Sequence, residues 1–153
     1  MVSEVGRTIN SSSNFAAGST TTNDIAMMHS KFGVREWFEA NKDNKDLMDK
    51  YLKFRLSMCK EELDETLDAI EAKDPEEIVD GLIDMCVFAI GTLDVFGVDP
   101  NVAWDRVYGA NMAKSPGVKE GRPNPFGLPD LIKPEGWEAP NHDGNHGDLN
   151  KAL

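Results

Sequence analysis

Apolar side chains recur every three or four residues through the middle of the chain, which is the spacing of a helix with an apolar stripe. Between residues 45 and 72 this stripe consists of Leu52, Leu56, Cys59, Leu63, Leu67 and Ile70. The opposite side of the same segment begins with Tyr51, Phe54 and Met58, which are also large and apolar. The pattern therefore predicts one long helix over 45–72 that buries both of its faces.

A second long helix is predicted to run from Pro75 to about Phe96. It follows a break at Lys73, where Asp74 is a good N-cap and Pro75 suits the first helical position. Its apolar residues lie on both sides, and they are Val79, Leu82, Cys86 and Leu93 on one side and Phe88 and Gly91 on the other. Because apolar residues surround it, we expect this helix to be central and buried.

The rest of the chain divides into an arm, two short helical pieces, a third long helix and a tail. Residues 1–22 are rich in Ser, Thr, Asn and Gly and are expected to be a flexible arm. A short helix should start near Asn23 or Asp24 and end at Gly33, and a second helical piece should lie within 34–44. A third helix should run from Pro100 to near Lys114. The prediction is an all-α bundle of four to five helices over 23–114, followed by an irregular tail over 115–153 that is able to pack on an active site.

Composition restricts the class of protein. The chain has 153 residues, which suits one domain, and its net charge of −11 argues against a nucleic acid polymer as partner. No apolar run is long enough to span a membrane, and the start of the chain lacks a secretion signal pattern. Cys59 and Cys86 lie in apolar helical patterns and are interpreted as reduced core residues. These features predict a cytoplasmic protein, in a host cytoplasm if the protein is viral.

Two acidic clusters are the main candidates for chemistry. Glu61, Glu62 and Glu65 belong to the motif E-E-L-D-E. After eleven intervening residues, Glu77 and Asp80 belong to the motif E-I-V-D. Acids three or four apart share a helix face, so adjacent helices can direct these carboxylates to one point. Crowded carboxylates raise each other's pKa, and a hard cation such as Mg²⁺ removes that penalty. A solvated acidic face is the alternative, but the apolar surroundings of the second helix favour a metal site.

Other site classes find little support. The histidines, His29, His142 and His146, do not form the Glu-x-x-His pairs of di-iron bundles, and no zinc, Walker or Rossmann pattern is present. Asn111 and Lys114 close the third helix as N-M-A-K. They are either an ordinary polar helix end or an amide and an ammonium that reach phosphate oxygens.

The ordered set of motifs resembles the all-α nucleoside triphosphate pyrophosphohydrolases, a MazG-like superfamily that includes dimeric dUTPases and phosphoribosyl-ATP pyrophosphohydrolase. Its signature, E-E-x-x-E followed by E-x-x-D, is matched at 61–65 and 77–80. Further segments resemble the short single-domain branch common in phages and bacteria, and they lie at 24–33, 80–84, 91–99, 111–114 and 131–140. The separation of the two acidic motifs is at or just under the short end for this family, which implies a tight turn.

The resemblance implies a metal-dependent hydrolase. It implies Mg²⁺, for which Mn²⁺ can substitute, held by Glu62, Glu65, Glu77 and Asp80. It makes Glu61 an extra ligand or a base that orients water, so that Glu61, Glu62 and Glu65 are the catalytic candidates. The expected reaction converts a (deoxy)nucleoside triphosphate, with a dGTP-like nucleotide as our guess, to the monophosphate and pyrophosphate in nucleotide-pool control.

The resemblance also implies a substrate site and a homodimer or homotetramer. The expected substrate-binding residues are Asp84, Asn111, Lys114, Lys133, His29 and Phe32, with the lysines and the amide on phosphate oxygens and the others near sugar or base. Phe32 is equally well explained as an ordinary core residue, and His29 is explained without the resemblance as a surface or packing residue. The alternatives are phosphoribosyl-ATP pyrophosphohydrolase and a non-catalytic helical oligomerisation module.

Overall fold

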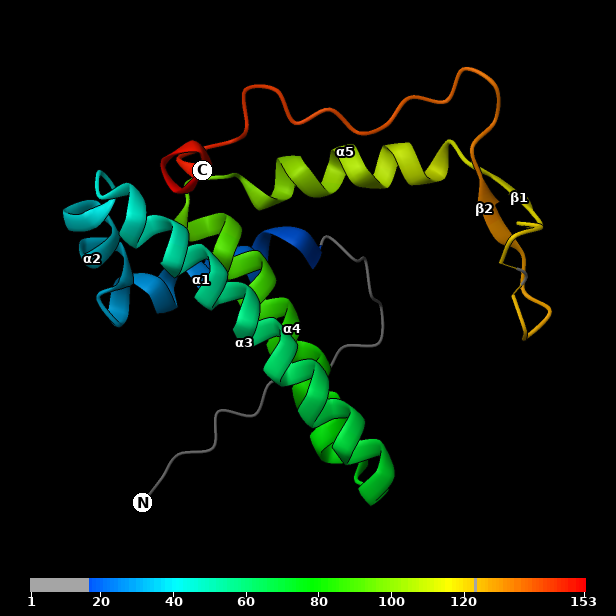
Figure 1. Cartoon of the computed structure of the whole chain (residues 1–153), viewed down its shortest axis with the longest axis horizontal. Coiled ribbons are helices and arrows are strands. Elements are labelled where there is room, and N and C mark those ends of the chain that lie inside the picture. The colour runs from blue at the N-terminus through cyan, green and yellow to red at the C-terminus, as the bar shows by residue number, and fades with distance from the viewer. Residues whose placement is uncertain (1–16, 123) are drawn as a thin grey trace.

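The structure is a computed structural model that describes residues 17–122 and 124–153. Within these residues the chain forms five α-helices and a small two-stranded sheet (Figure 1). The elements are α1 (Ala17–Lys31), α2 (Val34–Asn41), α3 (Lys45–Ala72), α4 (Pro75–Val95), α5 (Pro100–Met112), β1 (Ser115–Gly117), β2 (Asp130–Ile132) and a short 3₁₀ helix, η1 (Leu149–Ala152). The predicted mostly helical fold is confirmed.

The helices α3 and α4 form a long hairpin that is the framework of the molecule (Figure 1). The turn between them is tight, because Lys73 takes a left-handed conformation with φ 57°. Asp74 caps the new helix, and its Oδ1 accepts hydrogen bonds from the backbone N–H groups of Glu76 and Glu77 at 3.1 and 3.3 Å. The predicted bounds of α3 and the predicted cap of α4 are therefore confirmed.

The hydrophobic core lies at the open end of this hairpin. Phe38 of α2, Met48 of α3, and Val95 and Phe96 at the end of α4 are buried together with Ala152 of η1. Phe38 and Phe96 meet edge to face, with ring centroids 5.1 Å apart, a favourable arrangement for aromatic rings. The last residues of the chain thus complete a core that begins on α2.

The tail over 115–153 is more constrained than the predicted irregular segment. Antiparallel pairing joins β1 to β2, with Ser115 opposite Ile132, and the chain then returns along α5 to the core (Figure 1). Asn145 holds this return, since its Oδ1 accepts from the Asp99 N–H at 2.8 Å and its Nδ2 donates to the Asp99 carbonyl at 3.0 Å. These contacts are long-range hydrogen bonds, which leave no periodicity in the sequence.

At the N-terminal side, α1 starts earlier than predicted. The helix begins at Ala17 and continues through Asn23 and Asp24, so neither residue is its N-cap. It ends at Lys31, close to the predicted stop at Gly33. The flexible arm predicted for 1–22 falls mostly outside the described residues.

The distal half of the hairpin is not covered by any other described element, which contradicts the predicted burial of α3 and α4. Leu67 is 52% exposed and Ile83 is 58% exposed. Apart from Met48 and Val95 in the core, the buried positions of the two helices are small residues, namely Thr66 and Ala69 on α3 and Gly81, Gly91 and Thr92 on α4. Small residues let the backbones approach closely, and this leaves the large apolar side chains on the outside of the pair.

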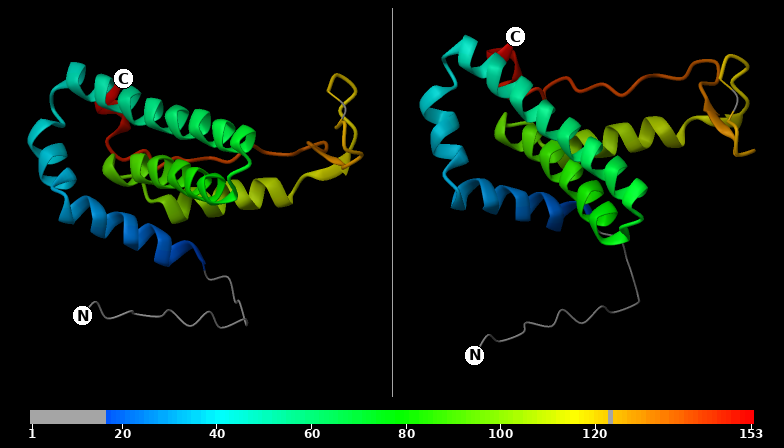
Figure 2. Two further views of the ribbon diagram at one scale, coloured as in Figure 1. Left: turned by 90° about the horizontal axis from the view of Figure 1, so that it is seen from below. Right: turned by 60° about the horizontal axis from the view of Figure 1, so that its bottom comes forward.

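The helix α5 leaves the end of α4 after a four-residue turn (Figure 2). In the described part of the chain, no single helix is long and apolar enough to cross a membrane. Taken together, α4 and α5 pass that test by length and composition only, with a bend of 116° between them.

Candidate active site

The acidic residues lie on the two helices of the hairpin, beside its closest backbone approach. The Thr66 hydroxyl donates to the Glu62 carbonyl at 2.6 Å. A Cβ on Gly81 would overlap that hydroxyl and lie 3.5 Å from the Glu62 carbonyl oxygen. Gly81 therefore allows α4 to pack directly against the turn of α3 that carries Glu62 and Glu65.

Glu62 is the acid on which the local charges converge. Burial raises the pKa of the Glu62 carboxyl above its ordinary value, and the negative charges of Asp84, Glu65 and Glu61 raise it further. A carboxylate in this environment favours a bound proton or a bound cation over a free negative charge. Acids of both helices therefore act on Glu62, but the one from α4 is Asp84 and not the predicted Glu77 or Asp80.

The predicted metal ligands are not gathered around one point. Within the described residues, no group of three or more His, Cys, Asp or Glu side chains is placed so that it could hold a metal ion. The donor set nevertheless fits Mg²⁺ in its chemistry, because it consists only of carboxylate oxygens. The acids thus lie on the two hairpin helices, as predicted, without forming such a group among the described residues of one chain.

The acids are also more exposed than predicted. Glu62 is half-buried, while the others are exposed, namely Glu61, Glu65, Glu77, Asp80 and Asp84. The prediction of a buried acidic cleft is thus wrong for a single chain. Its basis was the apolar surroundings of α4, and those apolar residues face outward because the described chain has no third layer over this part of the hairpin.

Three of the predicted phosphate-binding residues form one cluster at the far end of α5. The Lys114 ammonium donates to Asn111 Oδ1 at 2.9 Å. Lys114 and Lys133 both lie over the ring of Trp137, at 5.2 and 4.8 Å from its centroid. The Trp137 indole N–H is itself fixed to the Ala110 carbonyl at 2.7 Å. The tail therefore brings the two lysines together, as a cation pair on an aromatic platform.

This cation cluster lies away from the carboxylates of the same chain. In Figures 1 and 2 the end of α5 and the small sheet project to one side, and the acidic half of the hairpin extends in another direction. From the sequence we predicted that the carboxylates and the lysines form one site. A single described chain brings the cations together but does not join them to the carboxylates.

His29 does not face solvent in this structure, unlike the substrate contact predicted for it. It is 7% exposed, and its Nδ1 lies 2.7 Å from Asp94 Oδ2. Arg35 donates to both oxygens of the same carboxylate, at 3.0 and 2.8 Å. Gly91 makes room for the ring, since a Cβ there would lie 3.2 Å from His29 Cε1. The His29 imidazole thus connects α1 to α4. Phe32, also predicted near the sugar or base, is exposed.

Sequence reasoning missed this polar network and its continuation on α3. The Arg55 Nε donates to the Thr92 hydroxyl at 3.2 Å, and its Nη2 donates to the Phe88 carbonyl at 3.4 Å. A signal was available, because Arg55 and Asp94 each interrupt a mainly apolar helical segment. A charged residue within such a segment needs a partner when it is even partly buried.

Substitution of Gly81 tests the close approach of the two helices. Gly81→Ala should lower the free energy of unfolding by about 1–3 kcal/mol, because the added methyl overlaps the Thr66 hydroxyl. Chemical denaturation of the wild type and the variant measures this loss. The double variant Gly81→Ala, Thr66→Ala should recover part of it, and a double variant less stable than the sum of the two single changes would contradict the packing.

A comparison with protein families gives one match. Residues 34–111 match the sequence model of the family described as phosphoribosyl-ATP pyrophosphohydrolase. The matched region is slightly more than half of the chain, and it contains the whole hairpin and Asn111, but not α1 or the two lysines of the cation cluster. A comparison with curated proteins found no match.

Proposed function

Because the chain belongs to the phosphoribosyl-ATP pyrophosphohydrolase family of acid-anhydride hydrolases, we propose that it cleaves a nucleoside triphosphate between the α- and β-phosphates. The products are the nucleoside monophosphate and pyrophosphate. The observation that carries the proposal is that the family match covers the hairpin on which the negative charges of Asp84, Glu65 and Glu61 act on Glu62.

The family match favours phosphoribosyl-ATP over the deoxynucleotide that we expected from the sequence. A deoxynucleoside triphosphate is the second candidate. It is favoured by residues 24–33, which resemble the short single-domain branch and lie outside the matched region. Both substrates contain the same anhydride, so the chemistry proposed for the carboxylates is common to the two.

The carboxylates Glu62, Glu65, Glu77 and Asp80 would hold Mg²⁺, with Mn²⁺ as a substitute. When bound, the metal offsets the charge of the triphosphate and lowers the pKa of an attacking water. Glu61 lies next to these acids on α3 and would orient that water or accept its proton. Asp84 adds a further charge next to Glu62 and would contact the sugar or base.

We further propose that the phosphate-binding lysines come from a second copy of the chain. Lys114 and Lys133 are already paired on Trp137, but this pair and the carboxylates lie in different parts of one chain. A site assembled from two copies would combine the cations of one with the acids of the other.

The exposed side of the hairpin supports such an assembly. Large apolar residues are exposed along its distal half, namely Leu63, Leu67, Ile70, Val79, Leu82 and Ile83. Many large apolar residues exposed on one helical hairpin are typical of a protein interface. A homodimer, or a dimer of dimers, that covers this surface would also reduce the exposure of the acids beside it.

Mixing two inactive variants tests the shared site. Glu65→Gln removes an acid and Lys114→Ala removes a cation, so each alone should be inactive. After unfolding and refolding together in equal amounts, about a quarter of all sites should carry both native residues, because half of the randomly formed twofold dimers are mixed and one of their two sites is intact. Pyrophosphate release measures the recovery, and a mixture as inactive as its components would contradict a site built from two copies.

The raised pKa of Glu62 predicts how stability changes with pH in metal-free protein. A carboxyl whose pKa is higher in the folded state binds protons more tightly when folded, so stability falls as pH rises from its ordinary pKa to the raised one. Glu62→Gln removes this loss. The variant should therefore melt above the wild type at pH 7 in a chelator, and the difference should shrink toward pH 4. A difference that is constant over this range would contradict the assignment.

A substrate panel tests the proposed function. The full chain is assayed with Mg²⁺ for pyrophosphate release from phosphoribosyl-ATP, ATP and the canonical deoxynucleoside triphosphates. Phosphoribosyl-ATP is expected to have the highest kcat/KM, and a higher value for one deoxynucleotide would establish the second candidate. If pyrophosphate is released from none of these nucleotides, both enzymatic candidates are wrong and the non-catalytic helical oligomerisation module is the remaining alternative.

A further inference from the structure

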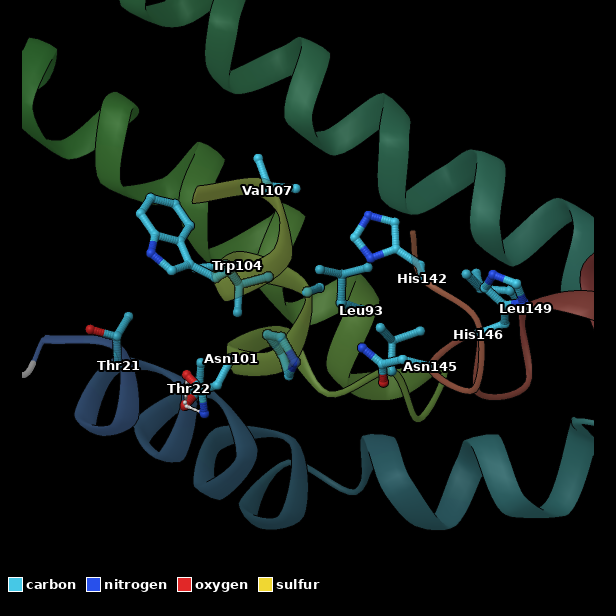
Figure 3. A pocket seen from close by; sticks show the side chains of 14 residues that line it. Thr21, Thr22, Leu93, Asn101, Trp104, Val107, His142, Asn145, His146 and Leu149 are labelled. Atoms are coloured by element: carbon cyan, nitrogen blue, oxygen red, sulfur yellow. Dashed lines mark hydrogen bonds between the residues drawn. The ribbon is translucent and has the colours of Figure 1, made fainter. Parts of the chain in front are cut away.

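A large apolar cavity lies between the start of α1, the end of α4, α5 and the returning tail (Figure 3). Its volume is about 740 Å³. Leu93, Val98, Val107 and Leu149 form much of its wall, and the Trp104 side chain stands beside it while the residue is 69% exposed. None of the described residues that line it is Asp, Glu, Lys or Arg. His142 and His146 are the titratable residues of this lining, which is otherwise mainly apolar and suits an apolar occupant. The lining does not include the carboxylates of the hairpin.

A second apolar feature without a partner projects from the other side of the molecule. We call residues 115–122 and 124–132 the β-arm, which consists of β1, β2 and the described residues between them. Phe126, near the tip of this loop, is 83% exposed, and Leu128 is 64% exposed. The tip is ordered by Asn124, whose Oδ1 accepts from the Phe126 N–H at 2.9 Å and whose carbonyl accepts from the Gly127 N–H at 3.4 Å. The loop thus presents an aromatic ring to solvent in a defined turn.

The β-arm does not reach the cavity of its own chain. It extends beyond the C-terminal end of α5 and away from the cavity, which lies beside the first half of that helix (Figures 1 and 2). We propose that the β-arm of one copy inserts Phe126 and Leu128 into the cavity of a second copy, and that the exchange is reciprocal. This goes beyond the proposed catalytic function and does not depend on it.

Charge and symmetry favour a second copy as the occupant. The tip residues 124–129 carry no charged side chain, and the described lining of the cavity holds no Asp, Glu, Lys or Arg. One contact covers both apolar features, and a reciprocal exchange about a twofold axis gives a closed assembly rather than a fibre. A small apolar molecule in the cavity would leave Phe126 exposed.

Cross-linking between two distinguishable copies tests the exchange. Cys59→Ser and Cys86→Ser remove the native thiols from the full chain. One isotope-labelled copy then carries Phe126→Cys, and an unlabelled copy carries Val107→Cys in the cavity wall. After joint refolding and mild oxidation, mass spectrometry should find an intermolecular disulfide between the two copies. Its yield should be at least about tenfold above that of a control pair, because docked residues share a high effective concentration.

The matched control pairs Phe126→Cys with Phe54→Cys. Phe54 is exposed and apolar like the cavity wall, but it lies on α3 and does not line the cavity. The double variant Phe126→Ser, Leu128→Ser provides a second readout, since it should increase acrylamide quenching of tryptophan fluorescence by uncovering Trp104. A cross-link yield equal to the control, or quenching unchanged by the double variant, would overturn the exchange.

Discussion

Glu65→Gln and Asp80→Asn should each lower kcat by at least about a hundredfold, since even residues that only orient metal ligands change activity by roughly 10–100-fold. Both side chains are exposed in the single chain, so their neutralisation leaves the packing of the hairpin unchanged. The expected effect is therefore on turnover and not on folding. Pyrophosphate release at saturating Mg²⁺ and substrate measures it, and circular dichroism verifies the fold.

Asp64→Asn is the matched control for these two variants. Asp64 lies on the same helix between Glu62 and Glu65, but its carboxylate pairs with Lys60 one turn earlier. Exposed pairs of this kind contribute only about 0.3–0.5 kcal/mol, and the control should keep nearly full activity. Near-wild-type turnover in Glu65→Gln or Asp80→Asn would mean that these acids do not hold the metal.

The second large effect is expected from a charge on the exposed apolar side of the hairpin. Ile83→Asp or Leu67→Asp should reduce the assembly to smaller species and abolish activity, because an unpaired charge is costly to bury in an interface. Both residues are more than half exposed in one chain, so the isolated fold should tolerate the change. Analytical ultracentrifugation measures the mass, and pyrophosphate release measures the loss of function.

Leu153→Asp is the control for the interface variants, because Leu153 is 70% exposed at the last position of the chain and lies off the hairpin. It should leave both mass and activity unchanged. An Ile83→Asp protein of unchanged mass would show that the distal half of the hairpin is not an interface.

The helices that were predicted well from the sequence are those with local signals at their ends. Asp74 and Asp99 each precede a proline and cap the helix that follows, so the starts of α4 and α5 depend on a few neighbouring residues. The start of α1 lacks such a signal, and the cap-like residues Asn23 and Asp24 lie inside the helix instead. Local chemistry thus defines the ends of the hairpin helices but not the first helix.

The burial of apolar helix faces was harder to predict, because apolar periodicity does not show whether the same chain or a second molecule covers the face. The stripe that contains Leu63 and Leu67 was interpreted as core, yet it is exposed in the described chain. The contact between α3 and α4 is made by Thr66 and Gly81, neither of which contributes to an apolar stripe. A sequence pattern gives the face that must be covered, and only the fold shows whether the same chain covers it.

The candidate site was predictable in its residue types and less so in its geometry. The negative charges of Glu61, Glu65 and Asp84 act on Glu62 because α3 and α4 are adjacent along the chain. Among the described residues, however, the predicted metal ligands do not gather around one point. The position of Lys114 and Lys133 depends on Trp137 and on pairing within the tail, contacts between residues far apart in sequence. Such contacts determine where the cations lie, and no local pattern encodes them.

The most direct test of the central claim is the identity of the products. The full chain is incubated with Mg²⁺ and either phosphoribosyl-ATP or a deoxynucleoside triphosphate, and the phosphorus-containing products are separated by anion exchange and followed by ³¹P NMR. Cleavage between the α- and β-phosphates predicts equal amounts of monophosphate and pyrophosphate, formed only with the metal and not by Asp80→Asn. Formation of diphosphate and orthophosphate, or the same products from the Asp80→Asn variant, would contradict it.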